Sequence, residues 1–188
     1  MKCILSVFCL FALTTGTAQT GQVHPYRDGT PGVTGYRSEV MALVVIQENE
    51  FIRLAEAIPA EKYNWRPGPA VRSIAEVLLH VSAANYNMYK SVGALPPAGL
   101  DVQGLEQSTT DKARVIATLK GSYEHAKKAI TDMPDSNLDK TLDWSGGKIT
   151  QRGVLLFIVP HIAEHLGQLI AYARINGVVP PWSEDAKK

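Results

Sequence analysis

Cysteine is almost absent from this 188-residue chain, and its two cysteines, Cys3 and Cys9, both lie near the N-terminus. So few cysteines exclude a disulfide-rich scaffold. The chain beyond residue 18 contains none, so that part has no thiolate to bind a metal or attack a substrate. Any metal held there must be bound by nitrogen and oxygen ligands.

A strong charge of either sign is also lacking. The chain has 19 Lys and Arg against 18 Asp and Glu, which gives a net charge of +1. Nucleic-acid-binding domains carry a basic excess or stripe, so we expect no nucleic-acid partner. With 15 Gly, 11 Pro and 45% hydrophobic residues, the composition excludes collagen-like and disordered chains and fits one globular domain.

Residues 1–18 have the layout of a secretory signal peptide. Lys2 precedes an apolar run at residues 3–13, and small residues lead to a cleavage site after Ala18. The run is too short to span a bilayer, which needs about 20 apolar residues. We therefore expect cleavage, no stable membrane anchor, and a periplasmic or extracellular mature protein. Because Lys2 is the only charge removed, that protein has 18 basic and 18 acidic residues.

The mature chain divides into three parts. Residues 19–35 are rich in Gly, Pro and Thr without periodicity and are predicted to be a flexible lead-in. Residues 36–182 form the domain, and residues 183–188 a short tail. Apolar residues recur at spacings of three and four in four stretches of the domain, which predicts four helices, at about 36–58, 73–92, 110–132 and 150–176.

Four helices of roughly 20 residues predict an all-α fold, a four-helix bundle with long connections. Ser73-Ile-Ala-Glu76 is a capping box that begins the second helix. Pro160 lies inside the fourth, where a kink is favoured over a break because the apolar period continues across it. Strand alternation is weak and limited to about residues 140–149. The pattern does not determine which helices are neighbours.

Three of the five histidines are predicted to face the core. His161 and His165 are four residues apart, so both rings leave one face of the fourth helix. His80 lies on the apolar stripe of the second helix. Buried neutral imidazoles need partners for both nitrogens, and one metal ion would satisfy a nitrogen of each. The other two, His24 and His125, are expected to be exposed to solvent.

These residues predict a site for one divalent metal ion bound by His80, His161 and His165. Three protein ligands leave coordination positions open, as in catalytic rather than structural sites. Zn or Ni is the favoured ion. Because imidazole binds several metals, Mn and Fe remain alternatives.

Four polar residues are candidates for roles beside the metal. Glu164 is placed to act as a base or as a partner of a ligand, or simply as a solvated surface residue. Gln168, Asn87 and Gln47 interrupt apolar stripes near the histidines. Each either contacts the substrate or makes an interhelical hydrogen bond.

His161-x-x-Glu164-His165 also matches the inverzincin peptidase pattern, with Glu164 as general base. That pattern takes a third, carboxylate ligand well downstream. Only 23 residues follow His165, and the acidic ones, Glu184 and Asp185, lie in the Pro-rich tail. The peptidase is therefore the less favoured interpretation.

The arrangement resembles the DinB-like (DinB/YfiT) superfamily. The matching segments are Trp65-Arg66-Pro67, Ser73 to His80, and His161-x-x-x-His165-Leu-Gly-Gln168, followed by Tyr172-x-Arg174 and Pro180-Pro181. The resemblance implies a four-helix bundle that binds a divalent metal through His80, His161 and His165, often as a homodimer. Some members are thiol S-transferases, but a secretory leader fits poorly with small reduced thiols, which are mainly cytosolic.

Three hypotheses for function follow. The first is an exported metal-dependent hydrolase or transferase that acts on a small molecule, in which the ion activates water or polarises a carbonyl or phosphoryl oxygen. The second is a non-catalytic exported bundle that binds a metal or another ligand. The third is a metal-free bundle whose histidines are purely structural. The sequence does not identify the substrate.

Overall fold

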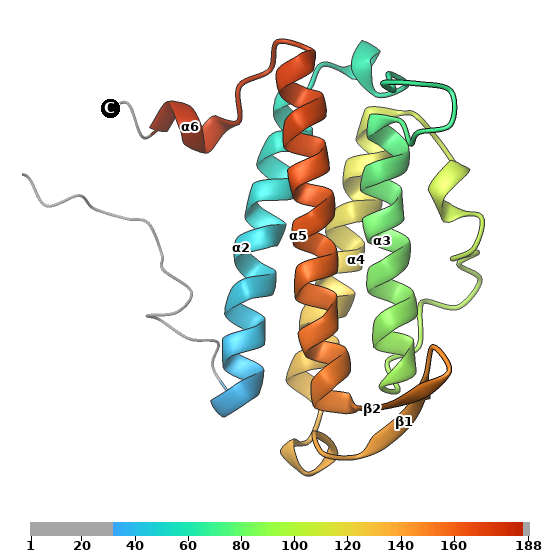
Figure 1. Cartoon of the computed structure of the whole chain (residues 1–188), viewed down its shortest axis with the longest axis vertical. Helices are drawn as coiled ribbons and strands as arrows, with labels where there is room; N and C mark the ends of the chain where they lie inside the picture. The colour runs from blue at the N-terminus through green and yellow to red at the C-terminus, as the bar shows by residue number, and fades with distance from the viewer. Residues whose placement is uncertain (1–31, 186–188) are drawn as a thin grey trace, which may run out of the picture.

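A computed structural model describes residues 32–185, and four long helices dominate this part of the chain (Figure 1). The predicted signal peptide, most of the lead-in and His24 lie outside the described residues. The long helices are α2 (Gly35–Ala57), α3 (Ile74–Ser91), α4 (Lys112–Asp132) and α5 (Gln151–Ile175). The prediction of an all-α four-helix bundle is confirmed, with each helix near its expected position.

The helices form a ring in which α4 packs between α2 and α3, and α5 packs between the same two helices on the other side. Figure 1 shows α2 and α5 running in one direction and α3 and α4 in the other. The consecutive helices α3 and α4 are therefore parallel neighbours. The connection over residues 92–111, which contains the short helix η2 (Leu105–Gln107), returns the chain along the bundle to the start of α4. This long connection carries a residue of the site described below.

Side-chain caps fix where the two site-bearing helices begin. At α3, the Ser73 hydroxyl accepts from the Glu76 amide, and the Glu76 carboxylate accepts from the Ser73 amide, so the predicted capping box is present. At α5, the Thr150 hydroxyl accepts from the Gly153 amide. Helix α5 continues through Pro160 as one element, as the apolar period predicted.

The core lies between the four helices and fixes their inner faces. Val154, Ile158, Ile162, Leu166 and Leu169 are buried on α5, at the three- and four-residue spacings that predicted the helix. Within residues 32–185, α5 is also long and apolar enough to cross a membrane, a property that core helices share. The largest completely buried side chains include Tyr63, Tyr89, Tyr123, Phe51, Leu78, Leu119 and Leu155.

A two-stranded hairpin joins α4 to α5, in the region where strand alternation in the sequence is only weak. Strands β1 (Thr141–Trp144) and β2 (Gly147–Thr150) pair antiparallel, with Trp144 opposite Gly147. The two turn residues, Ser145 and Gly146, both have positive φ, at 46° and 82°. Such a turn matches the right-handed twist of the strands. Short elements complete the described chain: η1 (Ala60–Lys62), η3 (Asp135–Asn137) and α6 (Pro181–Asp185), the last falling in part within the predicted tail.

Candidate metal centre

Three histidine side chains converge between α3 and α5. His80 lies in the second turn of α3, and His161 and His165 lie one turn apart on α5, which packs against α3 in the opposite direction. Ring centroids are 5.4 Å apart for His80 and His161, 4.6 Å for His80 and His165, and 4.7 Å for His161 and His165. One ring nitrogen from each lies within 4.8 Å of the other two. All three side chains are half-buried.

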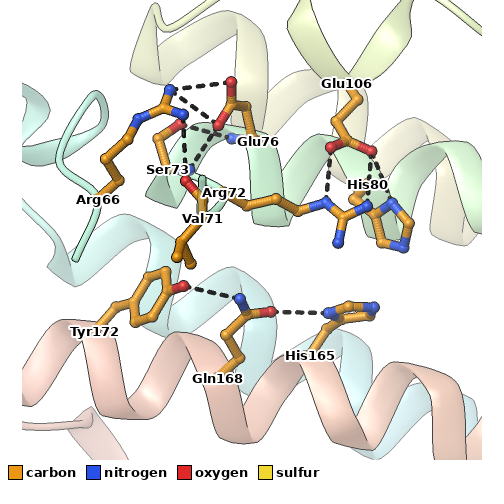
Figure 2. Close-up of polar contacts among 10 residues, drawn as sticks. All are labelled: Arg66, Val71, Arg72, Ser73, Glu76, His80, Glu106, His165, Gln168 and Tyr172. Carbon is orange, nitrogen blue, oxygen red and sulfur yellow. Dashed lines mark hydrogen bonds and ion pairs between the residues drawn. The ribbon is translucent and has the colours of Figure 1, made fainter. Parts of the chain in front are cut away.

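Glu106 of η2 fixes the ring of His80. Its Oε2 atom lies 2.8 Å from His80 Nδ1, and Arg72 Nε donates to its Oε1 over 2.7 Å (Figure 2). An ionised carboxylate only accepts hydrogen bonds, so His80 must carry its proton on Nδ1, which leaves the Nε2 lone pair free. Burial acts to raise the pKa of Glu106, but hydrogen bonds from Arg72 and His80 outweigh burial and hold that pKa below its ordinary value.

Gln168 fixes His165 in a similar way. The Gln168 carbonyl oxygen lies 2.9 Å from His165 Nδ1, and the amide nitrogen donates to the Tyr172 hydroxyl over 2.9 Å (Figure 2). A carbonyl oxygen accepts, so His165 also carries its proton on Nδ1 and leaves Nε2 free. The Trp65 ring packs on its edge against Tyr172, with centroids 5.4 Å apart. The loop before α3 therefore supports the site through α5.

Hydrogen bonds tie that loop to the beginning of α3. The amides of Ile74 and Ala75 donate to the carbonyls of Trp65 and Tyr63. Arg66 also pairs with the capping residue Glu76, at 3.0 Å. The segment that carries Trp65 is thus held to the same end of α3 that Arg72 precedes, eight residues before His80.

His161 lacks the support that the other two rings have. Its Nδ1 atom is buried without a hydrogen-bond partner among the described residues. Burial, followed by the neighbouring His165 and His80, lowers the pKa of His161 to about 4. Burial also lowers the pKa of His80, although the hydrogen bond to Glu106 opposes this. His161 and His80 are therefore neutral at physiological pH, the form that binds metals.

The residues present fit a divalent ion. Two imidazoles are fixed with Nε2 free, and their Nδ1 protons are held by a carboxylate and an amide, as is usual for histidine ligands of metals. The third ring has a buried nitrogen that lacks a protein partner. The three imidazole rings pack against one another, with centroids 4.6 to 5.4 Å apart, and a common ion would bind one nitrogen of each. His80, His161 and His165 would hold the ion, which would supply a Lewis acid.

The other predicted site residues lie at different distances from the cluster. Glu164 is exposed on α5 and close enough to raise the pKa of His161, against the stronger effect of burial. Both polar atoms of the Gln168 side chain are hydrogen-bonded, the oxygen to His165 and the nitrogen to Tyr172. Asn87 is exposed and lies about 10 Å further along α3 than His80.

Gln47 makes the interhelical hydrogen bond that was one of its two predicted roles. Its side chain is buried and donates from α2 to the carbonyl of Val159 on α5, at 3.0 Å. Val159 lies two residues before His161, so Gln47 supports the α5 backbone next to the site. The Gln47 carbonyl oxygen is buried and has no partner among the described residues.

The expectation for His125 is wrong. Its ring is half-buried, its Nε2 atom is not accessible to solvent, and burial lowers its pKa. Tyr86 of α3 packs over it, with ring centroids 5.0 Å apart. The charged neighbours of His125 in sequence suggested an exposed surface, but α3 packs closely against α4 along this side.

Arg72 and Glu106 were missed by sequence reasoning. Glu106 lies in a connection without periodicity, where one acidic residue gives no signal of its own. Arg72 precedes the capping residue Ser73, and its position relative to the histidines depends on how residues 92–111 fold back. The sequence pointed to such residues only indirectly, because each buried imidazole needs a hydrogen-bond partner for its second nitrogen.

Comparisons with known proteins agree with this fold. The chain is 24% identical over 146 residues to the uncharacterized protein YjoA of Bacillus subtilis, covering 74% of this chain and 90% of YjoA. The crystal structure of YjoA, a DinB-like protein, superposes with a TM-score of 0.60 at 20% identity, covering 74% of this chain and 92% of that one.

Two further structures show the same architecture. A DinB-like protein from Bacillus cereus has a TM-score of 0.64 at 14% identity, covering 73% of this chain and 90% of its own. A conserved protein from Enterococcus faecalis has a TM-score of 0.62 at 13% identity, covering 76% and 97%. A sequence model of the DinB superfamily matches residues 44–169, more than half of the chain and a segment that includes all three histidines of the cluster. The protein therefore belongs to the DinB superfamily.

Proposed function

We propose that the protein is an exported metal-dependent hydrolase or transferase that acts on a small molecule. One divalent ion would be held by His80, His161 and His165, with Zn or Ni favoured and Mn or Fe as alternatives. The observation that carries this proposal is the convergence of three ring nitrogens within 4.8 Å, with the Nδ1 atoms of His80 and His165 held by Glu106 and Gln168.

The ion, once bound, would polarise an oxygen of the substrate or of water. The protein residues contribute orientation and proton transfer. Glu106 and Gln168 hold two rings in one tautomer and one direction. Glu164, exposed beside His161, is the carboxylate available to accept a proton from a nucleophile or to return it to a leaving group. The Trp65 and Tyr172 contact keeps α5 in place behind His165.

Metal analysis of protein purified without a polyhistidine tag tests this function. We expect about one divalent ion per chain, lost in each of the single variants His80→Ala, His161→Ala and His165→Ala. His125→Ala is the matched control, because His125 lies outside the cluster, and it should keep the metal. Stoichiometric metal in all three cluster variants would contradict the proposal.

A non-catalytic binding role is distinguished by turnover. The metal-loaded protein should act on at least one ester, amide, phosphoester or thiol-transfer substrate, and Glu164→Gln should slow that reaction without loss of metal. Metal binding with no turnover across such a panel would favour a bundle that only binds its ligand.

Export and assembly are part of the proposal. Cleavage after Ala18 predicts a mature chain beginning at Gln19, which intact-mass measurement of the protein from its native host would detect. A full-length cytoplasmic chain would contradict export. We also propose a homodimer, to be tested by light scattering, and a small-molecule substrate rather than nucleic acid, in keeping with the balanced charge.

A further inference from the structure

Arg72 lies directly beside the histidine cluster. Its Nη2 atom is 3.4 Å from Glu106 Oε2, the same oxygen that lies 2.8 Å from His80 Nδ1. Because the two contacts share one oxygen, the guanidinium is held next to the His80 ring (Figure 2).

One nitrogen of the guanidinium has no hydrogen-bond partner among the described residues. Nε and Nη2 face Glu106, whereas Nη1 makes no hydrogen bond to a described residue, and Figure 2 shows it on the side away from Glu106. The Arg72 side chain is 38% exposed, so this donor is open to a ligand. The planar guanidinium fixes the direction of the N–H groups on Nη1 once the other two nitrogens are bound.

The local charge would favour an anion once a divalent ion is bound. Glu106 is already paired with Arg72 and His80, and Glu164 is exposed on α5. The neutral histidines would leave the charge of a bound divalent ion uncompensated. Holding His80 needs only the carboxylate of Glu106, so the guanidinium is not required for the ring's tautomer.

We propose that Arg72 binds an anionic oxygen of the substrate, a carboxylate or a phosphate group, while the reacting part of the substrate faces the three histidines. This inference rests on the proposed metal site and specifies the substrate class for it. It makes Arg72 a substrate-binding residue and Glu106 the residue that positions both Arg72 and His80.

The inference is tested by measuring anion binding to the full chain loaded with cobalt. Binding is monitored through the visible absorption of the cobalt ion. The probes are acetate, methylphosphonate and, as a neutral analogue of acetate, acetamide. Each protein is studied at a metal concentration that saturates it. Arg72→Met should weaken binding of at least one anion by about tenfold or more, since hydrogen bonds to charged groups are strong. Acetamide binding should change little, and the anion affected shows whether the site takes a carboxylate or a phosphate.

Three further variants isolate the cause. Arg72→Lys keeps the charge and should lose less anion affinity than Arg72→Met. The lysine variant also serves as the test if the methionine variant folds poorly. Arg174→Met removes an exposed arginine elsewhere on α5 and should have no effect. Glu106→Gln should weaken metal binding. Because the glutamine oxygen can still accept from Arg72, this variant should lose less anion affinity at metal saturation than Arg72→Met.

Unchanged affinity for both anions in Arg72→Met would overturn the inference. A loss of anion affinity in Glu106→Gln equal to that in Arg72→Met would also overturn it, because Arg72 would then act only through His80. Wild-type protein that takes up no cobalt would instead overturn the proposed metal site itself.

Discussion

The contact between Glu106 and His80 determines which nitrogen of His80 is free. At 2.8 Å, with the carboxylate held by Arg72 on its other oxygen, it fixes both the tautomer and the direction of the ring. Gln168 performs the same task for His165 with a neutral amide. The charged partner is expected to contribute more, because hydrogen bonds to a carboxylate are stronger than those to an amide.

Replacing Glu106 by Gln should weaken metal binding by about 10- to 100-fold, the usual effect of losing such a partner. Competition with a chromophoric chelator would measure it. Glu124→Gln is the matched control, since Glu124 is an exposed residue paired with Lys127 on α4. Equal affinity in Glu106→Gln and wild type would show that the contact does not orient a metal ligand.

His161 predicts a pH dependence of stability in the metal-free protein. Its pKa is about 4 in the folded chain against about 6.5 in an unfolded one, so between these values the unfolded chain binds more protons. Stability is therefore complete above about pH 6.5 and falls as pH decreases toward 4. Since the ring is only half-buried, we expect a loss of about 1 kcal/mol rather than the full value of the shift.

Urea unfolding at pH 7.5 and pH 5 would measure this loss. His161→Phe removes the titrating group and should be less sensitive to the same change in pH. A variant as sensitive as wild type would show that His161 is not the group responsible.

Among the elements, the beginning of α3 does the most to position the site. The capping box fixes where the helix starts, and with it the direction of His80 two turns later and of Arg72 immediately before it. The loop with Trp65 is bonded to the same helix end. This explains why the Trp-Arg-Pro segment, the capping box and His80 occur together in the sequence.

Ser73→Ala should reduce the free energy of unfolding by about 1 kcal/mol, because it leaves an early backbone N–H of α3 without its partner in a buried position. Chemical denaturation would measure this. Ser38→Ala is a suitable control, since the Ser38 hydroxyl is exposed and donates only to a carbonyl within α2. Equal losses in both variants would contradict a specific role for the cap.

Sequence periodicity predicted the helices well but did not determine which of them are neighbours. Helix bounds follow from caps, prolines and apolar spacing, which are local, so α3 and α5 were correctly placed along the chain. The position of Glu106 depends on how the connection over residues 92–111 packs against α3, which no local pattern records. The three histidines were found because two share a helix face and the third lies on an inward stripe, whereas Arg72 and Glu106 have no such signal.

At the scale of the whole molecule, we predict that metal binding and folding are linked. Helices α3 and α5 each contribute ligands, so an ion would bind the folded chain and not the unfolded one. At a free metal concentration of 100 times Kd, binding should stabilise the fold by about 2.7 kcal/mol. Thermal unfolding with and without EDTA would show it as a lower midpoint for the stripped protein. His80→Ala should show no difference between the two conditions.

X-ray absorption at the edge of the bound metal, in protein purified without a tag, tests most directly whether the three histidines are metal ligands. We expect a coordination shell that includes three imidazole nitrogens, at about 2.0–2.1 Å if the ion is zinc. Additional light ligands would fill the open positions. A shell without imidazole scattering, or protein with no stoichiometric metal, would contradict the assignment of His80, His161 and His165 as a metal site.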